Sequence, residues 1–152
     1  MNELSCAEMN AVWRVKKLLE REQRRLKDLE VFSSSTSPIL DGMPHAKPLV
    51  YKVERLATMM CECQSRIDEL AEQLIQAKFD LLNRIQSQRI NELYERVLCY
   101  HYVSCLKMFE VAKLIGYTRE HIWKLHNRGL KALGLNPTEM KHVKVATLGY
   151  AD

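Results

Sequence analysis

The residues from 118 to 132 combine charged, amide and apolar side chains at spacings that could read a nucleic acid. Ile122 and Leu125 are apolar, whereas the positions around them are mostly polar or basic. On an α-helix this pattern puts the apolar residues on one side and the polar ones on the other. Arginine and lysine can donate to guanine O6 and N7, and glutamate can accept from cytosine N4. The predicted chemistry is hydrogen bonding to DNA base edges and phosphates.

Individual residues of this run are predicted to meet different parts of a duplex. The predicted base contacts are Arg119, Glu120, Trp123, Lys124 and Asn127. The predicted phosphate contacts are Thr118, Arg128 and Lys131. Trp123 has an alternative interpretation as a half-buried aromatic, and His121 and His126 are interpreted as packing or capping residues.

A short helix and a tight turn are predicted to hold this polar helix in place. Gly116 can adopt a positive φ at little cost, which a sharp turn between helices usually requires. Thr118 is a suitable N-cap, because its hydroxyl can accept from an amide of the first turn. The predicted motif core, with its two small residues at a close helix crossing, is Ala112, Gly116, Ile122 and Leu125. This order is the plan of a helix-turn-helix, whose second helix enters the major groove.

Two long helices with a polar loop between them are predicted upstream. The first runs from about Met9 to Phe32, and the loop covers residues 33–48, where Pro44 and Pro48 should delay the next helix. From 49 to about 86, apolar residues step alternately by three and four, which is typical of coiled-coil packing. This seam comprises Val53, Leu56, Met60, Cys63, Ile67, Leu70, Leu74, Ala77 and Leu81, and a second strip comprises Ala71, Ile75, Phe79, Leu82 and Ile85.

The predicted fold is all-α, with an N-terminal long helical hairpin or coiled coil followed by the C-terminal helix-turn-helix. The seam needs a partner, which is either the first helix folding back or the same helix of a second copy. Residues 1–88 are assigned to the hairpin, 89–135 to the DNA-binding domain and 136–152 to a tail. A helix from Ile90 to Val103 is expected to lead into the motif, and the recognition helix should end near Leu133, before Gly134.

The positive charge of the chain is concentrated in its C-terminal part. The 152 residues contain 23 Lys and Arg against 19 Asp and Glu, a net charge of +4. Residues 1–88 contain 13 of each sign, so the whole excess lies in residues 89–152, with 10 basic and 6 acidic residues. The excess coincides with the proposed DNA-reading element, as phosphate attraction would require.

Other classes of function find little support in the sequence. The five cysteines contain no CxxC pair, and Cys61 and Cys63 would diverge on a helix, so no metal or cofactor is expected. No phosphate-cradling glycine loop, Ser/His/Asp order or paired acid motif indicates an enzyme. No apolar run approaches the ~20 residues that span a bilayer. The N-terminus lacks the apolar core of a signal peptide, so a cytoplasmic location is expected.

The C-terminal motif resembles region four of bacterial sigma factors, which recognises the promoter −35 element. The resemblance rests on the sequence from Thr118 to Leu125 and on its continuation at 130–133. The upstream residues 95–98 and 111–116 fit the same module, so about 45 residues are covered. Lys107 stands where the module usually has a Ser or Thr cap. No segment resembles the sigma regions that bind the −10 element or melt DNA.

The whole layout is similar to a narrower group of small phage- or prophage-encoded regulators of late genes. Asp41-Gly42-Met43-Pro44 and the run from His121 to His126 match that group. The resemblance implies a transcriptional regulator in the bacterial host cell, associated with the nucleoid. It implies that Arg119, Glu120 and Lys124 contact bases, and that RNA polymerase is a candidate partner besides double-stranded DNA. A homodimer or higher oligomer through residues 50–86 is also expected. The alternative is a coiled-coil adaptor or an anti-sigma-like protein that binds a protein without reading DNA.

Overall fold

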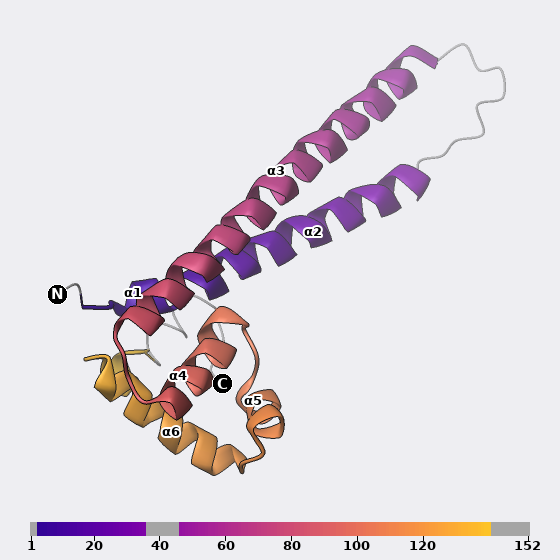
Figure 1. Ribbon diagram of the computed structural model, residues 1–152. Helices are drawn as coiled ribbons and strands as arrows, with labels where there is room; N and C mark the ends of the chain where they lie inside the picture. The colour runs from indigo at the N-terminus through magenta and orange to yellow at the C-terminus, as the bar shows by residue number, and fades with distance from the viewer. Residues whose placement is uncertain (1–2, 36–45, 141–152) are drawn as a thin grey trace. The chain divides into compact units, whose positions relative to one another are not determined.

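The protein is all-α, as predicted. The computed structural model describes residues 3–35 and 46–140, and these residues contain helices and connecting turns but no strand. Figure 1 shows the helices in chain order. They are α1 (Cys6–Met9), α2 (Ala11–Ser35), α3 (Ala46–Ser87), α4 (Glu92–Leu98), a π-helix η1 (Cys99–Val103), α5 (Met108–Ile115) and α6 (Arg119–Ala132).

The first predicted helix is interrupted near its start. The hydroxyl of Ser5 accepts from the Glu8 amide and begins the one-turn α1, which ends at Asn10 before α2 starts. α2 then continues to Ser35, past the predicted end at 32. Serines weaken a helix without forbidding it, and the Ser34 hydroxyl donates to the Val31 carbonyl of its own helix at 2.9 Å.

The predicted loop at 33–48 is longer than the observed connection. α3 begins at Ala46, so Pro48 lies inside its first turn rather than before the helix. Proline is tolerated there because the first amides of a helix have no acceptor within it. Residues 36–45, with the Asp41–Pro44 match, lie outside the described residues.

The predicted seam of α3 is buried in part. Cys63, Ile67 and Leu81 are buried, but Val53 is 49% exposed. The second strip also departs from the prediction, since Ile75 and Phe79 are 70% and 60% exposed although Ile85 is fully buried. Regular spacing identifies one side of a helix, but the length of that side that is covered depends on its neighbours.

The contacts divide the chain into two compact units, and the division cuts through both long helices. One unit contains the described residues up to Lys17 and those from Gln73 onward, and the other contains those of Leu18–Glu72. The predicted domain limits at 88/89 and 135/136 follow the order of elements along the chain instead. They remain a prediction about which parts fold separately.

The core of the first unit draws on three stretches of sequence. Its buried members from the N-terminus, the end of α3 and the C-terminal region are Leu4, Met9, Val12, Leu81, Ile85, Leu98, Tyr102, Val103, Cys105, Leu130, Leu133, Leu135 and Met140. The predicted tail from 136 therefore contains a residue of this core, Met140. Asn136 accepts from the Thr138 amide at 2.9 Å, and Met140 is 2% exposed. Lys141, His142 and Lys144 lie outside the described residues.

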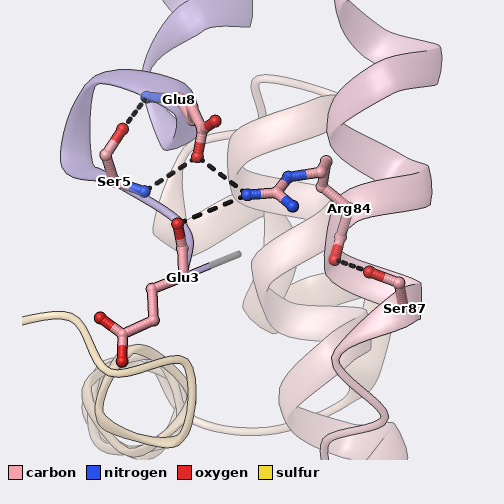
Figure 2. Close-up of polar contacts among 5 residues, drawn as sticks. All are labelled: Glu3, Ser5, Glu8, Arg84 and Ser87. Atoms are coloured by element: carbon pink, nitrogen blue, oxygen red, sulfur yellow. Dashed lines mark hydrogen bonds and ion pairs between the residues drawn. The ribbon is translucent and has the colours of Figure 1, made fainter. Parts of the chain in front are cut away.

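A polar contact joins the N-terminus to the end of α3 in this unit. The Glu8 carboxylate accepts from the Ser5 amide at 3.0 Å and from Arg84 at 3.3 Å (Figure 2). Arg84 also donates to the Glu3 carbonyl at 3.4 Å. The hydrogen bond from the Ser5 amide, together with Arg84, lowers the pKa of Glu8 below its ordinary value.

The second unit has a smaller core of its own. Leu29, Cys63 and Ile67 are buried, and the half-buried Leu19, Leu26, Leu56, Met59 and Met60 pack against them. The Cys63 thiol donates to the Glu22 carbonyl oxygen at 3.3 Å and lies 3.4 Å from the Glu22 carboxylate. Burial is the main cause that raises the pKa of Cys63, and Glu22 adds to it.

Candidate nucleic-acid interface

The segment before the candidate site is a short α-helix that continues into a π-helix. The Asn91 side chain caps α4 by accepting from the Leu93 amide at 2.9 Å. The predicted helix from Ile90 to Val103 is therefore α4 followed by η1. A π-turn holds more residues than an α-turn, which changes the direction of the side chains that follow it. His101, Tyr102 and Val103 are consecutive and all buried.

α5 begins and ends with backbone contacts that explain its short length. At its start the Glu110 carboxylate accepts from the Lys107 amide at 3.0 Å, so Glu110 satisfies an amide although Lys107 offers no cap oxygen. At its end Gly116 has a φ of 86°, and its amide donates to the Ala112 carbonyl at 2.8 Å. The chain then turns within two residues toward α6.

The start of α6 is capped as the sequence indicates. Thr118 has an extended backbone, and its hydroxyl accepts from the His121 amide at 3.3 Å. Figure 1 shows α5 and α6 joined by this turn. The geometry of a short helix, a left-handed glycine and a capped second helix is thus present.

The close approach between helices occurs at a different glycine from the predicted one. A Cβ on Gly116 would meet no atom within 4 Å, so this residue serves the turn and not a helix crossing. At Gly129 a Cβ would lie 3.0 Å from Leu98 Cδ1 and 3.3 Å from Tyr94 Cβ. The small residue that lets α6 approach α4 is therefore Gly129. The sequence contains a signal for this crossing, because Gly129 stands four residues from the apolar Leu125 and four from Leu133, on the same side of the helix.

The other predicted motif residues form one cluster under α6. Ala112, Ile122 and Leu125 are 7%, 0% and 4% exposed and pack with the buried Val97, Met108 and Val111. Trp123 is half-buried against this cluster, and its ring lies edge-on to His126 with centroids 5.3 Å apart. This placement matches its alternative interpretation as a packing aromatic.

The remaining predicted contacts lie on the exposed surface of α6 and at its N-cap. All are exposed: Thr118, Arg119, Glu120, Lys124, Asn127, Arg128 and Lys131. From Arg119 to Lys131 this surface, which we call the α6 polar face, holds four basic residues and one acidic residue. Within the described part of the chain, none of the four cations has an ion-pair partner. These five side chains together therefore carry a net positive charge.

The two histidines of α6 differ in their surroundings. His121 is exposed and meets the Tyr117 ring edge-on with centroids 4.9 Å apart. His126 is 5% exposed, and its Nε2 lies 2.7 Å from the Tyr102 hydroxyl. Its Nδ1 lies 3.1 Å from Oδ1 of Asn127. A buried residue thus contacts a residue of the α6 polar face.

A network of aromatic residues behind α6 was not foreseen from the sequence. The indole nitrogen of Trp13 donates to the His101 carbonyl at 3.0 Å, and Nδ1 of His101 lies 2.7 Å from the Leu106 carbonyl. The rings of His101 and His126 meet edge-on with centroids 5.5 Å apart. The successive residues His101 and Tyr102 indicate such a network, but their partners Trp13 and His126 are 88 and 24 residues away in sequence.

The described residues can also be searched for a metal site, a reactive thiol and a membrane-spanning helix. In that part of the chain no group of three His, Cys, Asp or Glu side chains could hold a metal ion. Burial, with a smaller contribution from Glu95, raises the pKa of Cys99 to about 11, so this thiol is protonated at neutral pH. None of the helices in 3–35 and 46–140 combines the length and apolarity needed to cross a lipid bilayer.

Comparisons with known proteins returned no relative. No protein-family model matches the sequence, and no curated protein or solved structure matches the chain.

Proposed function

We propose that the protein is a sequence-specific DNA-binding regulator of transcription that reads duplex DNA with α6. The observation that carries this proposal is the α6 polar face, whose exposed cations and amide belong to a helix that is held in place by its buried residues Ile122 and Leu125. An α-helix of 14 residues is about 21 Å long, which suits a segment of the major groove.

The contacts divide by position along the helix. Arg119, Glu120, Lys124 and Asn127 are proposed to meet base edges, and Arg128 and Lys131 phosphates. Thr118 is proposed to contribute with the amides of the first turn, because helix N-termini bind anions. Trp123 is half-buried, so its contact with DNA is proposed only for the exposed edge of its ring.

The resemblance to sigma region four gives the proposal its biological setting. It supports a regulator of phage or prophage genes that reads promoter-type DNA inside a bacterial host, near the nucleoid. RNA polymerase is the partner that this setting implies.

One small helix-turn-helix makes few base contacts, so a second half-site is proposed to raise specificity. Dimerisation through α3 would supply it. The exposed apolar residues of that helix support this route, because apolar patches on a protein surface often mark sites of protein interaction. They are Val50, Tyr51, Val53, Ile75 and Phe79. A strict monomer in equilibrium sedimentation at micromolar concentration would exclude it.

The proposal is tested by selecting bound sequences from a random duplex library, with and without RNA polymerase. An enriched sequence in either selection supports it. A variant with Arg119→Glu and Lys124→Glu should lose the enrichment. The matched control is Arg24→Glu with Arg25→Glu, which makes the same charge change at exposed positions of α2. Equal enrichment by both variants, or none by the unchanged protein, would contradict the proposal.

A second candidate function is a protein adaptor or anti-sigma-like factor, favoured by apolar residues on α5 and the turn. Phe109, Leu114 and Tyr117 are 45%, 58% and 44% exposed. Such residues can bind a protein surface without any DNA. An adaptor would keep its partner when Arg119 and Lys124 are reversed in charge, and it would lose that partner in Phe109→Ser with Leu114→Ser.

A further inference from the structure

In the contact between His126 and Asn127, the oxygen of the Asn127 amide faces the imidazole ring. Nδ1 of His126 lies 3.1 Å from Oδ1 of Asn127. With the amide oriented in this way its oxygen accepts, and the ring nitrogen Nδ1 carries the proton of the hydrogen bond. The amide nitrogen Nδ2, on the other branch of the planar group, then faces away from His126.

The other nitrogen of the same ring has a partner suited to this protonation state. A neutral imidazole carries one proton, so Nε2 is an acceptor when Nδ1 is the donor. Nε2 lies 2.7 Å from the Tyr102 hydroxyl, which can donate to it. Tyr102 and His126 are 2% and 5% exposed, so both ends of this bond are held inside the core. The direction of donation thus runs from Tyr102 to His126 to Asn127.

We infer that Tyr102 and His126 are positioning residues that make Asn127 present its amide hydrogens to an acceptor oxygen on DNA. The inference rests on the proposed function, because it concerns a residue of the α6 polar face. With its oxygen engaged by His126, Asn127 is a poor match for the two-bond contact to adenine, which needs both the oxygen and the nitrogen outward. It is a good match for an oxygen that only accepts.

Two kinds of DNA oxygen fit this description, namely base oxygens and phosphate oxygens. They lead to different sequence preferences of the protein. Guanine and thymine present the oxygens O6 and O4 in the major groove, whereas adenine presents N7 and an amino group there, and cytosine presents an amino group. Phosphate oxygens are the same at every base pair. A contact to a base would make Asn127 favour guanine or thymine at one position. A contact to phosphate would support all sequences equally.

The tautomer of His126 can be measured without DNA. The ¹⁵N chemical shifts of the two ring nitrogens, recorded on the full chain near pH 8, report which one carries the proton. We expect the proton on Nδ1. A proton on Nε2 would turn the Tyr102 bond around and require the Asn127 amide to be reversed, which overturns the inference whatever the DNA result.

The effect on DNA is measured with a double-mutant cycle on the best selected duplex. Tyr102→Phe removes the hydroxyl and keeps the ring, and Asn127→Ala removes the amide. We expect Tyr102→Phe to weaken binding about two- to tenfold, the range of one neutral hydrogen bond, and to have no effect in the Asn127→Ala background. Tyr100→Phe, which removes a hydroxyl from the same π-helix, is the matched control.

The base substituted in the duplex identifies the acceptor. If replacing one guanine or thymine weakens binding of the unchanged protein but not of Asn127→Ala, the acceptor is a keto base. If no single replacement shows this coupling while Asn127→Ala weakens every duplex alike, it is a phosphate. An equal loss from Tyr102→Phe with and without Asn127 would mean that the tyrosine acts only through stability, and would overturn the inference.

The outcomes separate this inference from the proposed function. A chain that binds no duplex refutes the proposed function and removes the DNA part of the inference, even if the Nδ1 proton is found. A chain that binds DNA through Arg119 and Lys124 but has its His126 proton on Nε2 refutes the inference alone.

Discussion

Gly129 of α6 lies so close to Leu98 of α4 that a Cβ atom would stand 3.0 Å from Leu98 Cδ1. Leu98 is fully buried, and Tyr94 Cβ would be 3.3 Å away on the same side. The two helices can therefore approach this closely because residue 129 has no side chain. This contact, and not the turn glycine, determines how near α6 comes to its support.

Adding a methyl group at this crossing should destabilise the protein. Gly129→Ala gains about 1 kcal/mol of helix propensity, but crowding a packed core typically costs about 1–3 kcal/mol. Because Leu98 is fully buried and would have to shift, we expect a net loss of about 1 kcal/mol, measured by urea unfolding. Gly129→Val should lose more. In a Leu98→Ala background the Gly129→Ala loss should shrink or change sign, and an unchanged loss would mean that the crowding lies elsewhere.

Base and phosphate contacts should respond differently to salt. Removing Arg119 or Lys124 should cost about 1–3 kcal/mol on the best site and relax its sequence preference. Arg128→Ala should weaken binding to all sequences and reduce the slope of log affinity against log salt by about one. Fluorescence anisotropy at several salt concentrations measures both. Full affinity of Arg119→Ala and Lys124→Ala would show that the assignment of readers is wrong.

The contact among Ser5, Glu8 and Arg84 should make stability depend on acid. The folded-state pKa of Glu8 lies below its ordinary value of 4.5, first because the Ser5 amide donates to the carboxylate. A lowered pKa stabilises the fold above the unfolded-state value, and this contribution disappears as the pH falls through the folded-state pKa. Glu8 is half exposed, so we expect less than about 1 kcal/mol.

The measurement for Glu8 is the free energy of unfolding of the unchanged chain and of Glu8→Gln between about pH 7 and pH 3. The difference between them should be largest near neutral pH and vanish at the acid end. Glu54→Gln, at an exposed position of α3, is the control for losing one carboxylate. A difference that grows toward low pH would contradict the sign of the argument.

The cysteines should differ widely in reactivity. Only the thiolate is a nucleophile, and a pKa of about 11 leaves about one part in a thousand of Cys99 ionised near pH 8. Burial also raises the pKa of Cys63, whereas Cys61 is exposed. Iodoacetamide labelling followed by mass spectrometry should modify Cys61 first. Cys99 reacting as fast as Cys61 would show that its surroundings open in solution.

The sequence predicted local structure well where short-range chemistry decides it. Gly116 and Thr118 lie where the turn and the cap were expected, because a positive φ and a hydroxyl cap are properties of single residues. The buried side of α6 follows from the spacing of Ile122 and Leu125. The break at Asn10 and the start of α3 before Pro48 differ from the predicted helix limits. Both depend on which groups pair with the free backbone amides and carbonyls at helix ends.

Long-range relationships could not be predicted from spacing. The interaction of Tyr102 with His126 and the approach of Leu98 to Gly129 join residues that are 24 and 31 positions apart. The residue types around one member of each pair do not indicate which distant residue it contacts. The exposure of Ile75 and Phe79 has the same origin, since a regular apolar strip does not say how many neighbours cover it.

The mixed origin of the first unit's core bears on any attempt to transplant the α5–α6 pair. A fragment cut at residue 89 would discard Leu4, Met9, Val12, Leu81 and Ile85, which fill the core around Leu98 and Leu130. Such a fragment would expose the apolar residues that these five side chains cover, among them Leu98 and Leu130, and we expect it to aggregate. A working graft into another regulator would have to carry the amino-terminal seventeen residues and the final turns of α3 along with it.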